Sequence, residues 1–262
     1  MFSVVAAALL LFAISLFPSA GYAQHKVQVV SHRGANHVAP ENTLAAAKKC
    51  IEWGVDYVEV DVRTSKDGVL YILHDSSVNR TTNGQGLLRS LTSEQIDRLD
   101  AGSWFAPQFA GERIPRLEPF LKEIKGKIKV FFDVKEADLP TLIALVRKMK
   151  MENDSFFWFG RDADARAFRK LAPDLQLKIN AGTVEQIEKA HQEYGAQIIE
   201  IGLNNLTPET IRACRDRKMK IMVIHMQNDP AGFRKIIEMG ADMVNLDHAD
   251  VFLAVQKEVT AR

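Results

Sequence analysis

The sequence has no excess of charge of either sign. Its 262 residues contain 34 lysines and arginines and 33 aspartates and glutamates. A net charge of +1 offers no general attraction for nucleic acid or an anionic membrane, so we expect no nucleic-acid partner. An anionic ligand would need a local group of side chains. Cysteine is also scarce, and Cys50 and Cys214 alone exclude a disulfide framework or a thiolate zinc site. Since they are predicted on different helices, we expect free, buried thiols.

The first 23 residues lack charged side chains altogether. The stretch Phe2–Phe17 is almost wholly apolar, which fits a signal peptide and is short for a membrane-spanning helix. Gly21 and Ala23 suit a signal peptidase that cleaves after Ala23. We expect residues 1–23 to be a signal peptide and residues 24–262 to be the exported protein, periplasmic or secreted, with no membrane anchor after cleavage. The alternative is an uncleaved anchor, because this segment has no lysine or arginine.

Short apolar runs alternate along the remaining chain with longer segments that carry apolar residues every three or four positions. Such runs are typical of parallel strands buried on both faces, and such segments of amphipathic helices. We predict strands at 27–31, 55–62, 129–134, 155–159, 175–179, 197–201, 220–225 and 242–246. Predicted helices include 42–53, 92–99, 117–124, 139–149, 183–194, 208–217 and 230–239. Eight alternations in about 240 residues predict a (β/α)8 TIM barrel, with a doubly wound open sheet as the alternative.

One interval breaks this rhythm. Residues 63–127 separate the second strand from the third, a distance far longer than an ordinary loop. The interval contains a hairpin signal at 65–73 and a glycine-rich turn at 81–86. We therefore expect an insertion at about 64–118, at the C-terminal face of the barrel, where TIM-barrel active sites lie.

Two histidines occupy ends of predicted strands. His32 and Arg33 end the first strand, where histidine can transfer protons and arginine can bind a phosphate or carboxylate. His74 follows the hairpin strand and has Asp75 beside it. Two histidines on opposite sides of a phosphodiester can cleave it, one accepting a proton and the other donating one. Taken singly, each is also compatible with a core, capping or solvated histidine.

Acidic residues occupy the second and third strands. Glu59 and Asp61 are two residues apart, so their carboxylates share one face of the strand. Such acids suit a Mg²⁺ or Ca²⁺ ion, since buried carboxylates are costly unless paired or metal-bound. Asp133 and Lys135 share a face in the same way, so Asp133 can complete the carboxylate set and Lys135 can neutralise a phosphate oxygen. Structural ion pairs are the alternative for both strands.

An ordered series of motifs lies between residues 31 and 118. It comprises His-Arg-Gly at 32–34, Pro-Glu-Asn-Thr at 40–43, Glu-Val-Asp-Val at 59–62, Lys-Asp-Gly at 66–68, His-Asp at 74–75, Asn-Arg-Thr-Thr-Asn-Gly-Gln-Gly at 79–86 and Ile-Pro-Arg-Leu-Glu at 114–118. The series resembles the glycerophosphodiester phosphodiesterases. The resemblance implies a TIM barrel with a small insertion after strand two. It also implies hydrolysis of small-molecule glycerophosphodiesters to glycerol phosphate and an alcohol, within lipid and glycerol metabolism.

The resemblance also implies roles for individual residues. The implied acid–base pair is His32 and His74, the implied phosphate contacts are Arg33 and Lys135, and the implied ligands of a divalent cation, Mg²⁺ or Ca²⁺, are Glu59, Asp61 and Asp133. The family often has a longer glutamate where this chain has Asp133. For Asn42 the choice is between a place near the phosphate and a cap on the first helix, and we expect the cap.

Later strands depart from the family pattern. His225 stands where the family often has a Trp-Thr pair, and we expect it to face the pocket and alter substrate choice. Strand eight ends Asn245-Leu246-Asp247-His248, where Thr-Asp followed by an aromatic residue is common. We expect Glu200 to be a salt-bridged acid of the barrel. The departures concern the identity of the substrate more than the chemistry.

We expect the glycerol hydroxyl next to the ester to attack phosphorus, which gives a cyclic phosphate that water opens. One histidine removes the hydroxyl proton while the other protonates the leaving alcohol. One alternative is a phospholipase-D-like activity on lysolipids, with the aromatic stretch 104–109 as an apolar lip. The other is a secreted phosphate-ester binding protein without catalysis, against which the intact histidines and carboxylates argue.

Overall fold

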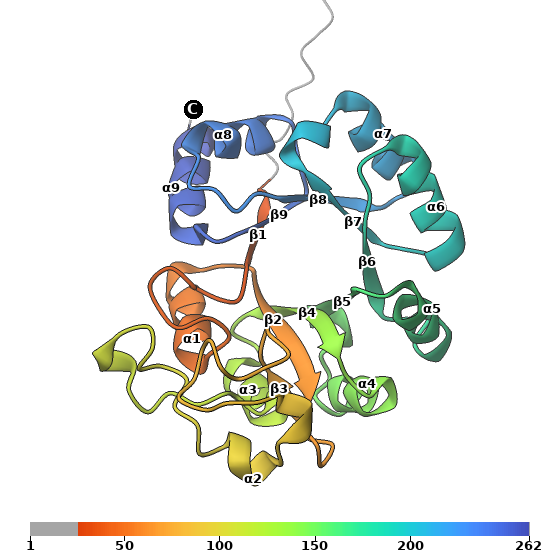
Figure 1. Cartoon of the computed structure of the whole chain (residues 1–262). Coiled ribbons are helices and arrows are strands. Elements are labelled where there is room, and N and C mark those ends of the chain that lie inside the picture. The colour runs from red at the N-terminus through yellow and green to blue at the C-terminus, as the bar shows by residue number, and fades with distance from the viewer. Residues whose placement is uncertain (1–25, 262) are drawn as a thin grey trace, which may run out of the picture.

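The computed structural model describes residues 26–261, so the predicted signal peptide lies outside the described residues. The first strand of its sheet, β1 (Gln28–Ser31), pairs in parallel with both β2 (Tyr57–Thr64) and β9 (Met243–Leu246), which closes the barrel. The parallel strands between them are β4 (Lys129–Glu136), β5 (Ser155–Phe159), β6 (Gln176–Asn180), β7 (Ile198–Gly202) and β8 (Lys220–Ile224). This closed sheet confirms the TIM barrel and excludes the open sheet (Figure 1).

Helices surround the barrel on its outside (Figure 1). They are α1 (Leu44–Trp53), α3 (Leu117–Ile124), α4 (Leu139–Lys148), α5 (Asp162–Leu171), α6 (Val184–Tyr194), α7 (Pro208–Asp216), α8 (Pro230–Glu238) and α9 (Ala249–Thr260). Thr183 and Thr207 cap α6 and α7 through their hydroxyl oxygens, which explains why these helices begin where predicted. Within residues 26–261, no helix combines the length and apolar character needed to span a membrane. Cys50 and Cys214 are free and buried, as predicted.

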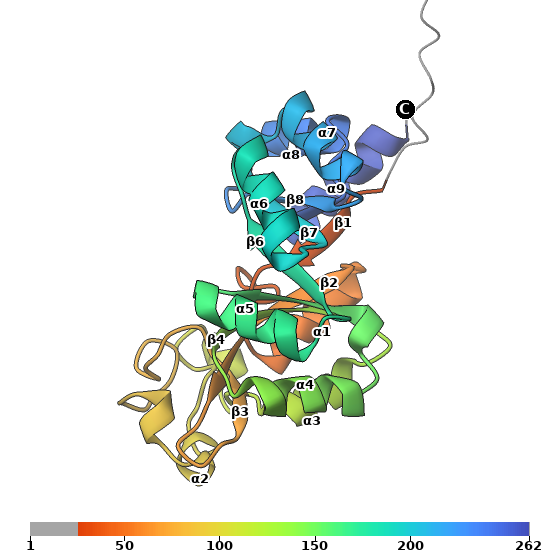
Figure 2. The same ribbon diagram turned by 90° about the vertical axis from the view of Figure 1, so that its right-hand side faces the viewer.

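The long interval between β2 and α3 has a small core of its own. Its strand β3 (Leu70–Ile72) pairs antiparallel with β2, and its helix α2 (Ser93–Ile96) is one turn, shorter than predicted. Its buried side chains are Tyr71, Leu73, Val78, Leu88, Ile96, Ala101 and Ile114. The segment projects beyond the ring of helices (Figure 2). It thereby places residues after β3 beside the end of β2.

The inside of the barrel has an apolar floor below a polar layer. Residues two apart on a strand share a face, so one strand can contribute to both levels, as β2, β7 and β9 do. The floor consists of Val30, Tyr57, Phe131, Phe156, Ile198, Met222 and Met243. Further toward the C-terminal strand ends lie the buried polar side chains Glu59, Asp61, Lys178, Glu200 and Asn245. The floor closes one end of the barrel and leaves the polar groups at the other.

Candidate active site

Three carboxylates meet where β2 lies beside β4. The register pairs Asp61 with Asp133, and Glu59 lies two residues before Asp61 on the same face. One oxygen from each lies within 4.8 Å of the other two. Glu59 Oε1 and Asp133 Oδ1 are buried and accept no hydrogen bond from the described residues, and Asp61 Oδ1 is buried with the Lys135 amine 3.2 Å away. Unsatisfied carboxylate oxygens that converge in this way fit a hard divalent cation.

The electrostatics of these acids favour a cation as well. Burial raises the pKa of Glu59 well above its ordinary value, and the charges of Asp61 and Asp133 raise it further. Burial also raises the pKa of Asp133, together with the charge of Asp61. Both shifts mean that the ionised cluster is destabilised in the fold. A bound cation would relieve this repulsion.

Two left-handed residues in the loop after β1 orient the carboxylates. Arg33 has φ 57°, and its backbone N–H donates to Glu59 Oε2 at 2.6 Å. Asn42 has φ 58°, and its Nδ2 donates to Asp61 Oδ2 at 2.7 Å while its Oδ1 accepts from the Asp61 backbone N–H at 3.2 Å. The expected cap role of Asn42 is therefore wrong. Thr43 caps α1 by accepting from Ala46 N–H, which leaves Asn42 to position Asp61.

Both predicted phosphate contacts lie against this cluster. Lys135 Nζ lies 2.7 Å from Asp133 Oδ2 and 3.2 Å from Asp61 Oδ1. Burial lowers the pKa of Lys135, but the charges of Asp61 and Asp133 outweigh burial and raise it, so the amine stays charged. Arg33 Nη1 donates to Glu41 Oε1 at 3.2 Å, and Arg33 Nε lies 3.7 Å from Asp61 Oδ2. Two cations thus border the carboxylates.

His32 lies immediately after β1 and is held by an aspartate. Its Nδ1 lies 2.8 Å from Asp247 Oδ1, which also accepts from Asn36 Nδ2 at 2.5 Å. Burial raises the pKa of Asp247, but these two hydrogen bonds outweigh burial and lower it. An ionised aspartate can only accept, so the proton of the neutral ring is on Nδ1 and Nε2 is the free base. Sequence reasoning assigned no role to Asp247.

His74 is fixed to the end of β2 by its backbone. The Leu73 N–H donates to the carbonyl oxygen of Asp61 at 2.9 Å, and Arg63 Nη2 donates to that of His74 at 2.7 Å. His74 Nδ1 lies 2.8 Å from Asp75 Oδ1. Each histidine therefore has an aspartate on Nδ1, which leaves Nε2 for proton transfer.

A chain of ion pairs joins the two loops that carry these groups. Arg80 donates to Asp75 Oδ2 at 2.7 Å and to both oxygens of Glu41 at 2.8 Å. The hydrogen bond from Arg80 lowers the pKa of Asp75. Glu41 also accepts a hydrogen bond from Arg33, so the chain of ion pairs runs from His74 to the Arg33 guanidinium beside Asp61. Sequence reasoning gave Glu41 and Arg80 no role. Both lie in the motifs of the family series, and their opposite charges could have predicted an ion pair between those motifs.

Of the two residues singled out on later strands, His225 points away from the barrel mouth and Glu200 points into it. The expectation that His225 faces the pocket is wrong, because its Nε2 lies 3.3 Å from Asp229 Oδ2 and its ring packs edge-on against Phe233 of α8. Side chains alternate along β8, so Ile224 takes the inward place instead. Glu200 forms a buried ion pair with Lys178 at 2.6 Å, as expected.

Comparison with known proteins agrees with this geometry. Residues 32–251 match the model of the glycerophosphoryl diester phosphodiesterase family. A glycerophosphodiester phosphodiesterase of Caldanaerobacter subterraneus is 32% identical over 87% of this chain and 97% of that protein. The crystal structure of one from Agrobacterium tumefaciens superposes with a TM-score of 0.85 at 38% identity, covering 87% of this chain and all of the other. An Oleispira antarctica phosphodiesterase, solved with the product sn-glycerol-3-phosphate, shares the fold with a TM-score of 0.80 at 23% identity, covering 88% and 96% of the two chains.

Proposed function

Since this chain belongs to the glycerophosphoryl diester phosphodiesterase family, we infer that it is a phosphoric diester hydrolase that converts glycerophosphodiesters to glycerol phosphate and an alcohol. The observation that carries this is the meeting of three carboxylates with two aspartate-held histidines at one end of the barrel. The product named for the Oleispira antarctica phosphodiesterase is consistent with glycerol phosphate as the product here.

We propose that Glu59, Asp61 and Asp133 hold a divalent cation, Mg²⁺ or Ca²⁺. When bound, such a cation polarises phosphate and hydroxyl oxygens and offsets developing negative charge. The unsatisfied carboxylate oxygens and the raised pKa of Glu59 support this assignment. Arg33 and Lys135 border the cluster and supply the positive charge that holds the phosphate.

The two histidines divide the proton transfers between them. One Nε2 accepts the proton of the glycerol hydroxyl next to the ester, and that oxygen attacks phosphorus to give a cyclic phosphate. The other, as an imidazolium, gives a proton to the oxygen of the leaving alcohol. Asp247 and Asp75 hold each ring in position and stabilise its charged form. Water then opens the cyclic phosphate with the roles of the histidines reversed.

The lysolipid alternative has less support from the side chains of the insertion. Phe105 packs edge-on against both Trp104 and Phe109, so this stretch packs on itself. Trp104 is 41% exposed, but its Nε1 donates to the Ala101 carbonyl. A single half-exposed indole is a small apolar surface for a lipid.

The proposed function is tested by turnover of purified protein with water-soluble glycerophosphodiesters and micellar lysolipids, with and without a chelator. We expect the soluble diesters to be hydrolysed faster and the chelator to stop the reaction. Binding without turnover would instead support the binding-protein alternative. We also propose that residues 1–23 direct export. N-terminal sequencing of the mature protein, which should begin at Gln24, tests this.

A further inference from the structure

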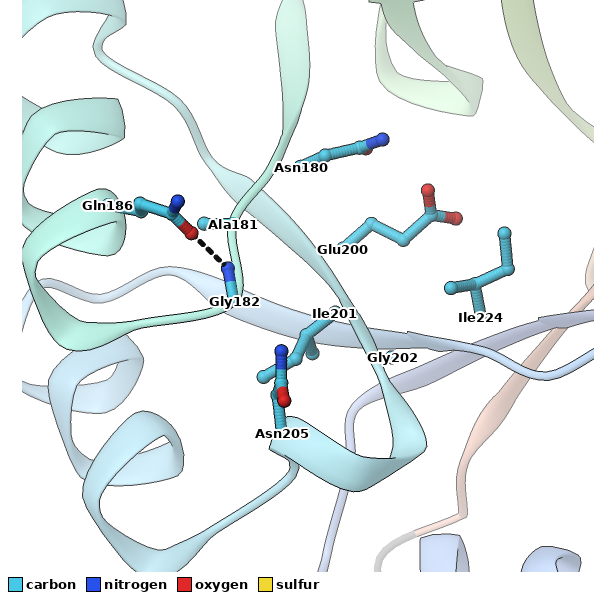
Figure 3. A pocket seen from close by; sticks show the side chains of 9 residues that line it. All are labelled: Asn180, Ala181, Gly182, Gln186, Glu200, Ile201, Gly202, Asn205 and Ile224. Atoms are coloured by element: carbon cyan, nitrogen blue, oxygen red, sulfur yellow. Dashed lines mark hydrogen bonds between the residues drawn. The ribbon is translucent and has the colours of Figure 1, made fainter.

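A cavity of about 290 Å³ opens at the C-terminal ends of β6, β7 and β8 (Figure 3). In the closed ring of eight parallel strands, β7 stands four places from β2 in either direction. The cavity therefore lies across the barrel mouth from the carboxylate cluster. The chemistry proposed above uses none of the side chains that line it.

The lining combines polar and apolar side chains, and its charge is balanced. The negative charge of Glu200 is matched by Lys178 at 2.6 Å, and the other Glu200 oxygen accepts from Asn245 Nδ2 at 3.1 Å. Three carboxamides supply most of the remaining polarity: Asn180, Gln186 and Asn205. The lining contains no aromatic residue.

The carboxamides keep hydrogen-bonding groups free for a ligand. Asn180 Oδ1 accepts from Lys178 Nζ at 2.7 Å, and Gln186 Oε1 accepts from the Gly182 N–H at 2.6 Å. Each therefore keeps an amide NH2 group. Asn180 and Glu200 project from their strands toward the same space as Ile224 (Figure 3).

One aromatic side chain connects this cavity to the phosphate contacts. The Trp158 ring lies 5.5 Å from Lys135 Nζ and 4.7 Å from Lys178 Nζ. Lys178 in turn binds Asn180 and Glu200 of the lining. A chain of contacts from Lys135 through Trp158 and Lys178 therefore joins the proposed phosphate contact to the lining of the cavity.

We propose that this cavity binds the leaving alcohol of the diester and favours uncharged polyhydroxy alcohols such as glycerol or inositol. The inference rests on the proposed function and adds the class of leaving group. Carboxamides donate to and accept from hydroxyl groups, which matches a polyol. A quaternary ammonium group would need aromatic faces or an unpaired carboxylate, and Glu200 is already paired. An acyl chain would bury the carboxamides without partners.

Gly202 offers a direct way to fill the cavity. It lines the cavity, its φ of −70° and ψ of 152° suit any residue, and a Cβ built there meets no atom within 4 Å. Gly202→Phe should therefore occupy the space without backbone strain, whereas Gly202→Ala adds only a methyl group. Leu171→Phe, at an exposed site where α5 ends, is the matched control for an added aromatic ring.

The experiment compares kcat/KM for four diesters of sn-glycerol 3-phosphate, with methanol, glycerol, inositol or choline as the leaving alcohol. The wild type should prefer the glycerol and inositol diesters to the choline diester. Gly202→Phe should lower the ratio of inositol diester to methyl diester by about tenfold or more, with little change in Gly202→Ala or Leu171→Phe. Asn205→Ala should lower the ratio of inositol diester to choline diester by about three- to tenfold.

The outcomes separate this inference from the function on which it rests. An equal loss on all four diesters in Gly202→Phe, or an unmoved ratio, would overturn the cavity as the alcohol site. A wild-type preference for the choline diester would overturn the polyol assignment. A wild type that turns over none of the four would overturn the proposed function itself, and the cavity assignment with it.

Discussion

The two sides of the barrel mouth balance their buried charge in opposite ways. Between β2 and β4, three carboxylates are bordered by only two cations, Lys135 and Arg33. The buried oxygens Glu59 Oε1 and Asp133 Oδ1 accept no hydrogen bond from the described residues. Across the barrel, Glu200 is matched by Lys178 and also accepts from Asn245. Unbalanced buried charge destabilises a fold, so its presence on one side indicates a site for a cation and for chemistry. The balanced side offers hydrogen bonds without excess charge, which suits recognition.

The largest effect is expected from removing a histidine on the unbalanced side. His32→Ala and His74→Ala should each lower kcat by about 10²–10⁴-fold, because a proton-transfer group is lost. Their side chains are 22% and 31% exposed, so the melting temperature should change little. His191→Ala, at an exposed position on α6, is the matched control and should retain wild-type kcat. Near-wild-type turnover in either site variant would contradict the assignment.

On the balanced side, breaking the buried Lys178–Glu200 ion pair should lower the stability of the fold. Lys178→Met leaves the Glu200 carboxylate buried without its cation, and we expect a loss of about 3–5 kcal/mol in the free energy of unfolding. Lys178→Met combined with Glu200→Gln should recover most of this loss, since no charge is then stranded. Urea denaturation measures both. A double variant as unstable as the single one would show that the unpaired charge of Glu200 does not cause the loss of stability.

Removing or restoring the divalent cation should change the free energy of unfolding through the carboxylates of the unbalanced side. The pKa of Glu59 is raised above its ordinary value of 4.5, so its contribution to stability is full below that pH and is lost as pH rises through the raised pKa. Metal-free protein should therefore lose stability between acid and neutral pH, and Glu59→Gln should reduce that loss. At pH 7.5, Mg²⁺ or Ca²⁺ at a hundred times its dissociation constant should restore about 2.7 kcal/mol. A melting temperature indifferent to both ions would contradict the cation site.

The smallest effect is expected from the ion-pair chain that joins the loop after β1 to the loop after β3. Glu41→Gln weakens the paired hydrogen bonds to Arg80, which also holds Asp75. We expect kcat to fall about three- to tenfold with little change in KM, since ring orientation is affected more than binding. Arg80→Lys should lie between wild type and Arg80→Ala if the charge matters. An unchanged kcat in Glu41→Gln would make the chain a surface feature only.

The sequence predicted best what depends on local spacing. All eight barrel strands lie within two residues of their predicted ends, because buried parallel strands are continuous apolar runs. Glu59 and Asp61 were predicted together because a two-residue spacing places both on one face of a strand, and Asp133 joined them as an acid at the end of the next strand. Asp247 was missed because it meets His32 only when the pairing of Ser31 with Leu246 closes the barrel.

The two wrong predictions about individual site residues each depended on a shift of one residue. His225 was expected in the pocket, but in the alternation along β8 Ile224 faces inward. Asn42 was expected to cap α1, but the cap is Thr43, one residue later. His225 is held by Asp229 in the loop that follows β8, and Asn42 is held by Asp61 on another strand, a partner that local spacing does not reveal.

The unbalanced side of the barrel mouth should cleave the bond between phosphorus and the leaving alcohol. Phosphorus NMR of the wild type acting on glycerophosphoglycerol and glycerophosphocholine, with Mg²⁺ or Ca²⁺ and again with excess chelator, tests it most directly. We expect the diester signal to give way to that of glycerol phosphate, through a transient cyclic phosphate, only when the cation is present. Turnover that persists in chelator, or phosphorus that stays on choline with glycerol released, would contradict it.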